Sequence, residues 1–217
     1  MADQTAPVTT PSGTPARSVG TPLAAILAVL TSVLGLIVLA WSVLYITKGR
    51  FLKHTFESVA GRMSEREIRV AGDFQFYFDP IDLKFRAEGL TVSNPAWAGP
   101  RPFFTSKLID TRIATFASIF GKRRINTLLL DGASIDAEWD KTGKRNTWTF
   151  ATEGEPFEMP IIKAGSITGT TVRYRDPRMM LSADLGIETV KARDTRFASA
   201  MRFSGSGSAR GNPFTIS

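Results

Sequence analysis

Residues 67–79 read EIRVAGDFQFYFD, and this stretch decides the fold. Apolar side chains take the even positions from Ile68 to Phe78, except at Gly72, while mostly charged and polar side chains take the odd ones. Successive side chains of a strand point to opposite faces of its sheet, so a period of two predicts strands with one apolar and one wet face. The sequence therefore predicts a β-sheet that begins here.

The same alternation continues toward the C-terminus. Its phase slips near Gly89, which predicts a β-bulge, and further alternating runs lie at 108–115, 124–140, 161–167, 172–175 and 181–188. Residues 141–144 have the composition of a hairpin loop, so 145–150 are expected to form the return strand. Recurrent helices of about 10–15 residues, which a parallel βαβ sheet would need, are not indicated. The pattern predicts a mainly β region of nine or ten strands, mostly antiparallel.

A different pattern precedes the strands. Residues 23–46 read LAAILAVLTSVLGLIVLAWSVLYI and carry no charge. As a helix they would rise about 36 Å, more than the ~30 Å hydrocarbon core of a bilayer. A cleaved signal peptide is the alternative, but its apolar region is normally only about 7–15 residues long. We therefore expect an uncleaved transmembrane helix over residues 23–47.

The segments on either side of this span differ from each other. Residues 1–22 are rich in Pro, Thr, Ser, Ala and Gly, a composition that predicts a disordered tail. Residues 48–66 place apolar side chains at helical spacing and predict a short juxtamembrane helix that continues the span and ends near Gly61. More basic residues follow the span than precede it, so the positive-inside rule favours a cytoplasmic C-terminal side.

Composition excludes several classes of protein. The 217 residues contain no Cys, which excludes disulfides, thiolate zinc sites and a Cys nucleophile. A single histidine, His54, leaves most catalytic triads and His-based metal sites without their residues. The net charge of +7 is spread along the chain rather than gathered in a stripe with interleaved aromatics, so no nucleic acid is expected as a partner.

Acidic residues offer one candidate metal site. Asp136, Glu138 and Asp140 share a strand face and could bind a cation, but a solvated face explains their alternation without any ligand. Phosphate-loop and dinucleotide-binding patterns are also missing from the sequence. We therefore expect no enzyme activity, no catalytic residue, no metal and no cofactor.

The apolar side of the predicted sheet leaves one question open. Aromatic side chains join Ile and Leu on this side, among them Phe74, Phe76, Phe78, Phe85, Trp139 and Tyr174. A second sheet packed on it would make a closed sandwich core, whereas an open, curved sheet would leave an apolar groove. A large exposed apolar surface marks an interaction site. Alternation alone does not distinguish the two arrangements.

Several short motifs follow the apolar span in a fixed order. They are EIRVAGD at 67–73, LKFRAEGLTVSNP at 83–95, RINTLLLDGA at 124–133, DKTGKRNTW at 140–148, and GSI followed by VRYRD within 165–176. The most specific pieces are LDGA and G-x-x-N-x-W. Over roughly residues 23–217 the chain resembles, in these motifs and their order, the N-terminal region of the AsmA family of bacterial envelope proteins.

The resemblance implies a single-pass anchor in the bacterial inner membrane with the β region in the periplasm, against the count of basic residues around the span. It implies that residues 67–217 form an AsmA-like open β-groove with an apolar lining, truncated at its C-terminal end. Such a groove would support phospholipid transport toward the outer membrane. Inner-membrane lipids and phospholipid acyl chains would be the partners, with outer-membrane or periplasmic envelope proteins as further ones.

The residues expected to line the groove are the apolar members of the alternating runs: Ile68, Val70, Phe74, Phe76, Phe78, Leu83, Phe85, Ile109, Ile113, Ile135, Trp139, Val172, Tyr174, Leu181, Leu185 and Ile187. The alternative function is a non-enzymatic scaffold or assembly factor for outer-membrane protein biogenesis. In that case the same residues would form a closed core, and the outer face would bind a protein partner.

Overall fold

The computed structural model describes residues 21–79, 82–115, 124–150, 161–190 and 200–217. The chain forms two units, residues 1–40 and 41–217; helix α1 (Thr21–Thr47) makes up the described part of the first and continues into the start of the second. This helix is long and apolar enough to cross a membrane. The expected transmembrane helix is thus present by length and composition, while most of the predicted tail at 1–22 lies outside the described residues.

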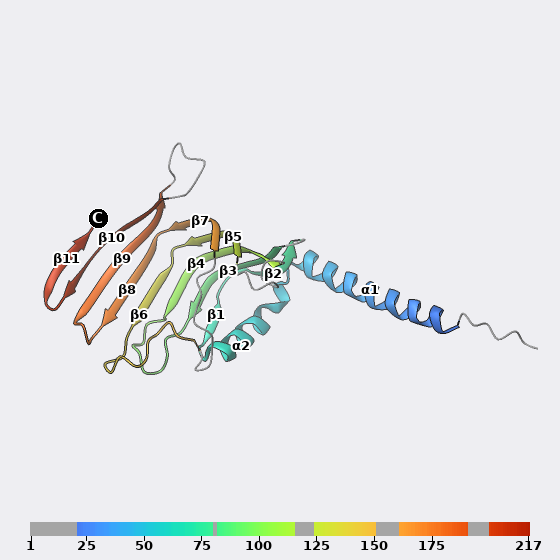
Figure 1. Cartoon of the computed structure of the whole chain (residues 1–217), viewed down its shortest axis with the longest axis horizontal. Helices are drawn as coiled ribbons and strands as arrows, with labels where there is room; N and C mark the ends of the chain where they lie inside the picture. The colour runs from blue at the N-terminus through green and yellow to red at the C-terminus, as the bar shows by residue number, and fades with distance from the viewer. Residues whose placement is uncertain (1–20, 80–81, 116–123, 151–160, 191–199) are drawn as a thin grey trace, which may run out of the picture. The chain divides into compact units, whose positions relative to one another are not determined.

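In the described residues of the second unit, two short helices and eleven strands are assigned, rather than nine or ten strands (Figure 1). Their bounds are η1 (Arg50–Leu52), α2 (Lys53–Ser64), β1 (Ile68–Val70), β2 (Phe74–Asp79), β3 (Asp82–Val92), β4 (Phe104–Ala114), β5 (Arg124–Asp131), β6 (Ser134–Glu138), β7 (Ile161–Thr168), β8 (Thr170–Asp176), β9 (Leu181–Val190), β10 (Ala200–Ala209) and β11 (Asn212–Ile216).

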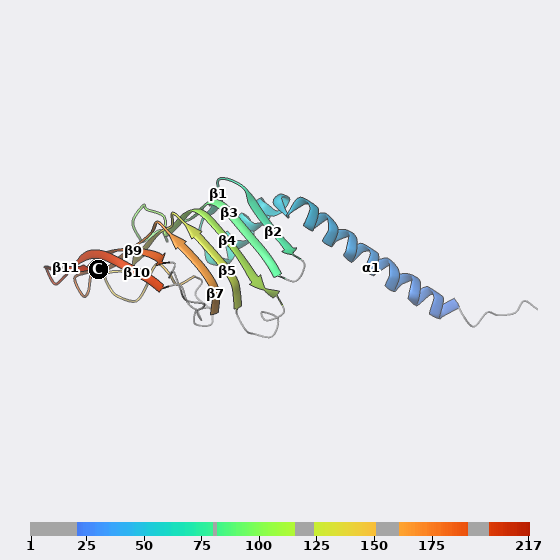
Figure 2. The ribbon, with the colours of Figure 1, turned by 90° about the horizontal axis from the view of Figure 1, so that it is seen from above.

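The strands form one open, mixed sheet. Its order is β1-β3-β4-β6-β8-β9-β10-β11, with β2 beside β3 and with β5 between β4 and β7. Figure 2 shows β2, β3, β4, β5 and β7 side by side. The pairs β5–β7 and β6–β8 are parallel, and the other described pairs are antiparallel. At its centre the sheet is therefore not a simple meander, in which each strand would pair antiparallel with the next one in the sequence.

Strands β5 and β6 act as one long strand with an interruption. Both pair with β4 in the same register, since Asp131 lies opposite Leu108 and Ser134 lies opposite Thr105. Strands β7 and β8 continue one another in the same way, beside β5 and β6. The interruptions fall at Gly132 and Gly169, which both have positive φ.

The bulge predicted near Gly89 is confirmed. Val70 pairs with Leu90 and Phe74 pairs with Ala87, so the three residues 71–73 on one side oppose the two residues 88–89 on the other. Gly89 has a φ of 64°, and a Cβ atom there would lie 2.9 Å from the Cβ atom of Ala71. Only glycine fits this position without strain. The bulge keeps apolar residues of β3 on one side of the sheet despite the change of phase.

The helix that precedes the sheet is not a continuation of α1. Lys48 and Gly49 have φ values of 53° and 61° and turn the chain between the two helices. Gly49 is buried, and a Cβ atom there would collide with the carbonyl group of Phe76. The Phe76 amide donates to the Lys48 carbonyl over 3.0 Å, so this turn covers the outer edge of β2.

The predicted helix end near Gly61 is also corrected. Helix α2 continues through this glycine to Ser64 and stops at Glu65, whose φ of 53° is left-handed. The Arg66 amide donates to the Gly61 carbonyl over 3.1 Å, which caps the last turn. Glycine is therefore inside the helix here, and an ordinary residue takes the left-handed position that glycine usually occupies.

The return strand expected at 145–150 does not form. Asn146 makes an isolated bridge to Trp139, and no described strand covers the rest of that segment. The chain does turn back at the expected loop, since the Asp140 amide donates to the Arg145 carbonyl over 2.9 Å. The antiparallel return is short and is last seen where the Thr147 amide donates to the Glu138 carbonyl over 3.0 Å. Strand β6 instead has the parallel strand β8 as its neighbour, and a parallel pair needs a crossover of a dozen or more residues.

The buried core lies where α2 covers one side of the sheet. Val70, Phe74, Ala87 and Leu90 form its fully buried cluster, and Leu52 and Phe56 from the helical segment pack against it. The ring centres of Phe56 and Phe74 are 5.1 Å apart. Glu57 on the same helix accepts a hydrogen bond from the Val70 amide over 2.7 Å, so the helix also covers the edge of β1.

Candidate functional site

One side of the sheet carries an unbroken row of apolar positions. The paired residues run through eight strands, from β1 to β11, in the order Ile68, Val92, Phe104, Ile135, Val172, Leu185, Gly205 and Ile216. Residues that lie directly opposite one another in neighbouring strands share a face of the sheet. At about 4.8 Å per strand, the seven steps of this row span roughly 34 Å. We call this side of the sheet the apolar face.

The opposite side of the same strands is polar. The neighbouring row contains Arg69, Thr91, Thr105, Ser134, Thr171, Gly186 and Ser204, none of which has an apolar side chain. We call this side the polar face. One sheet thus separates an apolar surface from a wet one over most of its width.

Fifteen of the sixteen predicted lining residues lie in strands and fall on the apolar face, while Trp139 directly follows β6 and bridges to Asn146. Phe76 pairs with Phe85, Leu83 pairs with Ile113, and the residues of β6, β8 and β9 follow the row described above. Trp139 and Tyr174 are joined through Trp148, whose ring centre lies 5.2 Å from that of Trp139 and 6.2 Å from that of Tyr174. That these residues contact a ligand stays a prediction.

The two ends of the apolar face differ in what covers them. Under α2, at the end formed by β1 to β4, Phe74 is 2% exposed and Ala87 is fully buried. Phe76 and Phe85, expected to line an open groove, pack against this buried cluster. We call this end the covered end. For these residues the closed-core interpretation describes the packing better than the groove does.

At the end formed by β8 to β11 the same face is open in the described residues. Phe203 is 46% exposed and Ile216 is 42% exposed. Their neighbours Val172, Leu185 and Ile187 are only partly buried. We call this end the uncovered end. It presents a contiguous apolar surface of the kind that marks interaction sites.

Three residues of the uncovered end were missed from the sequence. Phe203, Phe214 and Ile216 lie on the apolar face by register with β9 and β10. The glycines and serines between them, as in Gly205 and Gly207, give this segment the composition of a linker. The signal was nevertheless present, since these glycines alternate with serines at a period of two. The Phe214 ring lies where a Cβ atom of Gly207 would be, so the glycine makes room for the aromatic side chain.

Ion pairs cover the polar face. Lys84 pairs with Asp110, and Arg173 pairs with Asp184 over 3.0 Å. Of the three candidate cation ligands, Asp136 and Glu138 both contact Arg175, at 3.4 Å and 2.9 Å. No group of three potential metal ligands occurs in the described part of the chain. The acidic strand face thus has arginine as its counter-ion.

The third acid of that face, Asp140, organises a turn instead. Burial opposes its charge, but hydrogen bonds from Thr142, the Arg145 side chain and two backbone amides outweigh burial and lower the pKa of Asp140 well below its usual range. Asp176, the last residue of β8, has its pKa lowered chiefly by a hydrogen bond from Arg178. These carboxylates accept the hydrogen bonds that hold the loops at one end of the sheet.

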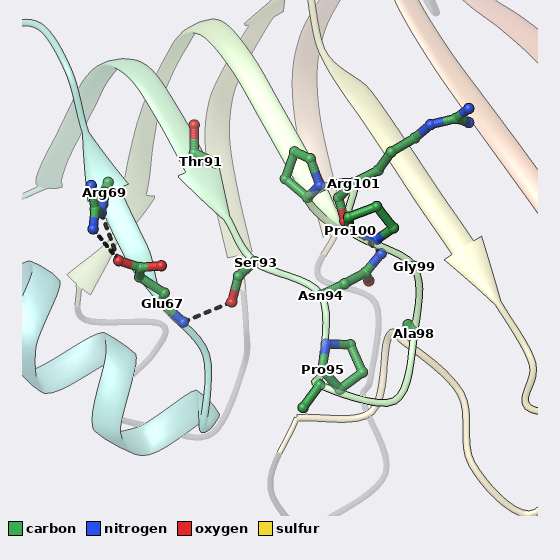
Figure 3. A pocket seen from close by; sticks show the side chains of 12 residues that line it. Glu67, Arg69, Thr91, Ser93, Asn94, Pro95, Ala98, Gly99, Pro100 and Arg101 are labelled. Carbon is green, nitrogen blue, oxygen red and sulfur yellow. Dashed lines mark hydrogen bonds and ion pairs between the residues drawn. The ribbon is translucent and has the colours of Figure 1, made fainter.

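A cavity with a mixed polar and apolar lining lies next to β1 and β3. Figure 3 shows Glu67 paired with Arg69, while the Glu67 amide donates to the Ser93 hydroxyl over 2.8 Å. Asn94 donates to the Arg101 carbonyl over 2.8 Å and closes the loop that forms the opposite wall. Arg69 of this cavity already has a carboxylate partner, and Arg101 is the other cationic residue of its lining.

No family model, curated protein or solved structure matches the chain.

Proposed function

We propose that this protein is anchored in the bacterial inner membrane by α1 and supports phospholipid transport toward the outer membrane along its apolar face, in the periplasm. The observation that carries the proposal is the apolar row from Ile68 to Ile216, which is left open at the uncovered end. The resemblance to AsmA proteins supplies the compartment and the direction.

The physical requirement of lipid transfer is simple. An acyl chain that leaves a bilayer loses about 0.8 kcal/mol for each methylene exposed to water, so it needs continuous apolar contact. One leaflet supplies about half of a ~30 Å hydrocarbon core, and the apolar row is roughly twice that length. A sheet with one apolar face therefore shields an acyl chain over its full length without any chemistry.

The polar face supports the same interpretation. Its charges are paired with one another, as in Arg173 with Asp184, so this side of the sheet is stable in water without a further partner. In an amphipathic sheet of this kind, only the apolar face would be stabilised by a ligand that shields it from water. Phospholipid acyl chains suit that side, and inner-membrane lipids are the source nearest to the anchor.

Lipid co-purification tests the proposal. The full chain would be purified from membranes in a mild detergent, and its extracted lipids would be identified by mass spectrometry. We expect bound phospholipid in the natural protein and its loss in Phe203→Asp. Ser204→Asp is the matched control, because it places the same charge one residue away on the polar face. A folded protein without lipid would favour the scaffold or assembly-factor function instead.

A further inference from the structure

Arg66 is the most unusual charged residue of the described chain. It follows α2 and is 9% exposed. Its Nη2 atom donates to the carbonyl groups of Thr147 and Thr149 over 3.1 Å and 3.4 Å. Its guanidinium lies 5.5 Å from the ring centre of Phe150. All of these contacts are with neutral groups.

The guanidinium is also incompletely hydrogen-bonded. Its Nη1 atom is buried and has no hydrogen-bond partner. A buried donor on a charged group is costly when it is left unpaired. The other buried charged side chains in the described ranges each have an oppositely charged partner: Asp136 with Arg175, Asp140 with Arg145, and Asp176 with Arg178. Arg66 departs from the rule that the rest of the fold follows.

Arg66 lines a cavity of about 400 Å³ between the end of α2 and two loops. Further lining residues are Trp97, Lys144, Arg145 and Asn146. Three cationic side chains thus face one acidic residue, Glu65, around this space. Within the described residues the Lys144 ammonium has no carboxylate partner, whereas Arg145 shares its charge with Asp140. The cavity therefore carries excess positive charge.

We propose that this cavity binds a phosphate group. Arginine suits phosphate because its planar array of donors matches the phosphate oxygens, and lysine adds a point charge. A bound phosphate would supply the hydrogen-bonded counter-ion that Arg66 lacks, beyond the nearby charge of Glu65, while Lys144 at the cavity wall adds a second cation. The phosphate belongs either to a phospholipid headgroup or to free phosphate, which share this chemistry.

The position of the cavity relates it to the apolar face. Thr147 and Thr149, which accept hydrogen bonds from Arg66, flank Trp148. The Trp148 ring in turn packs against Tyr174 on the apolar face. A headgroup held at Arg66 would thus have its acyl chains beside the apolar surface. Phosphate can bind at Arg66 whether or not acyl chains lie on the apolar face. The inference therefore goes beyond the proposed lipid transport, and each can fail without the other.

Binding of two probes to the full chain in a neutral detergent tests the proposal. Inorganic phosphate and a short-chain, water-soluble phosphatidic acid would each be titrated by calorimetry. Lys144→Glu is the informative variant, and Lys141→Glu is its matched control. Lys141 is exposed in the same loop but does not line the cavity. We expect Lys144→Glu to weaken binding by about tenfold or more, and Lys141→Glu to change it little.

The two probes distinguish the sources of the phosphate. Similar binding of both supports a site for the phosphate group itself, and binding of the phosphatidic acid alone supports a headgroup site. Absence of saturable binding by either probe would overturn the proposal, as would equal weakening by the two lysine variants. Arg66→Met should abolish binding. If that variant does not fold, the comparison of Lys144→Glu with Lys141→Glu still decides the question.

Discussion

The covered and uncovered ends of the apolar face share one sequence pattern but differ in environment. At the covered end Phe74 is 2% exposed, because Phe56 of α2 packs on it. At the uncovered end Phe203 is 46% exposed in a strand of the same sheet. The same alternation thus produces a core where a helix lies on the sheet and an exposed apolar surface where none is described. Burial, rather than hydrophobicity, distinguishes the two ends.

Shortening a buried side chain at the covered end should have the largest effect on stability. Phe74→Ala removes a buried aromatic ring that contacts Phe56 and Phe85, and such changes cost about 3–5 kcal/mol. Urea denaturation followed by circular dichroism would measure the loss. A cost below about 1 kcal/mol would show that this end is not a packed core, and would remove the distinction between the two ends.

The bulge that keeps β3 in phase should have the next largest effect. Gly89→Ala places a methyl group 2.9 Å from the Ala71 Cβ atom at a φ of 64°, which should cost about 1–3 kcal/mol. Gly99→Ala is the control, because a Cβ atom at that loop position meets nothing within 4 Å. Equal midpoints of thermal unfolding for the two variants would contradict this account of the bulge.

Acid should weaken the uncovered end through Asp176. The Arg178 hydrogen bond lowers the folded-state pKa of this carboxyl, so its stabilisation is full above about pH 4 and is lost as the pH falls through the folded pKa. Asp176→Asn should therefore reduce the dependence of stability on pH below that point. Urea midpoints measured at several pH values would show it. An unchanged slope would mean that Asp176 does not titrate on unfolding.

The smallest effect on stability is expected at the uncovered end itself. Phe203→Ala should cost less than about 1 kcal/mol, because its side chain is already 46% exposed. The contrast with Phe74→Ala, the same substitution on the same face, is the sharpest test of the comparison. Similar costs at the two positions in urea denaturation would mean that the uncovered end is packed in solution.

Local patterns in the sequence predicted the local features of this fold. The apolar span, the alternation from Ile68 onward and the phase slip at Gly89 each depend on neighbouring residues, and each is present. The parallel pairing of β5 with β7 was not predicted, because alternation looks the same in parallel and antiparallel strands. The return strand expected at 145–150 is reduced to a short antiparallel contact around the bridge between Asn146 and Trp139.

The sequence predicted which face of the sheet carries the apolar residues, but not which of these residues are exposed. Register places Leu185 and Phe76 on the same face, as the alternation indicated, yet Phe76 packs against the buried cluster below α2. Which part of the face a helix covers is decided by packing between distant segments. The burial of Arg66 was equally unpredictable from the sequence, because the residues that bury it, Thr147 and Phe150, lie more than eighty positions away.

Photo-crosslinking tests the central claim most directly. A benzophenone amino acid would replace Phe203 on the apolar face or Ser204 on the polar face, in the full chain within bacterial membranes. The account predicts phospholipid adducts after irradiation at position 203 and few or none at position 204. Equal labelling at both positions, or labelling at 204 alone, would contradict a lipid-bearing apolar face.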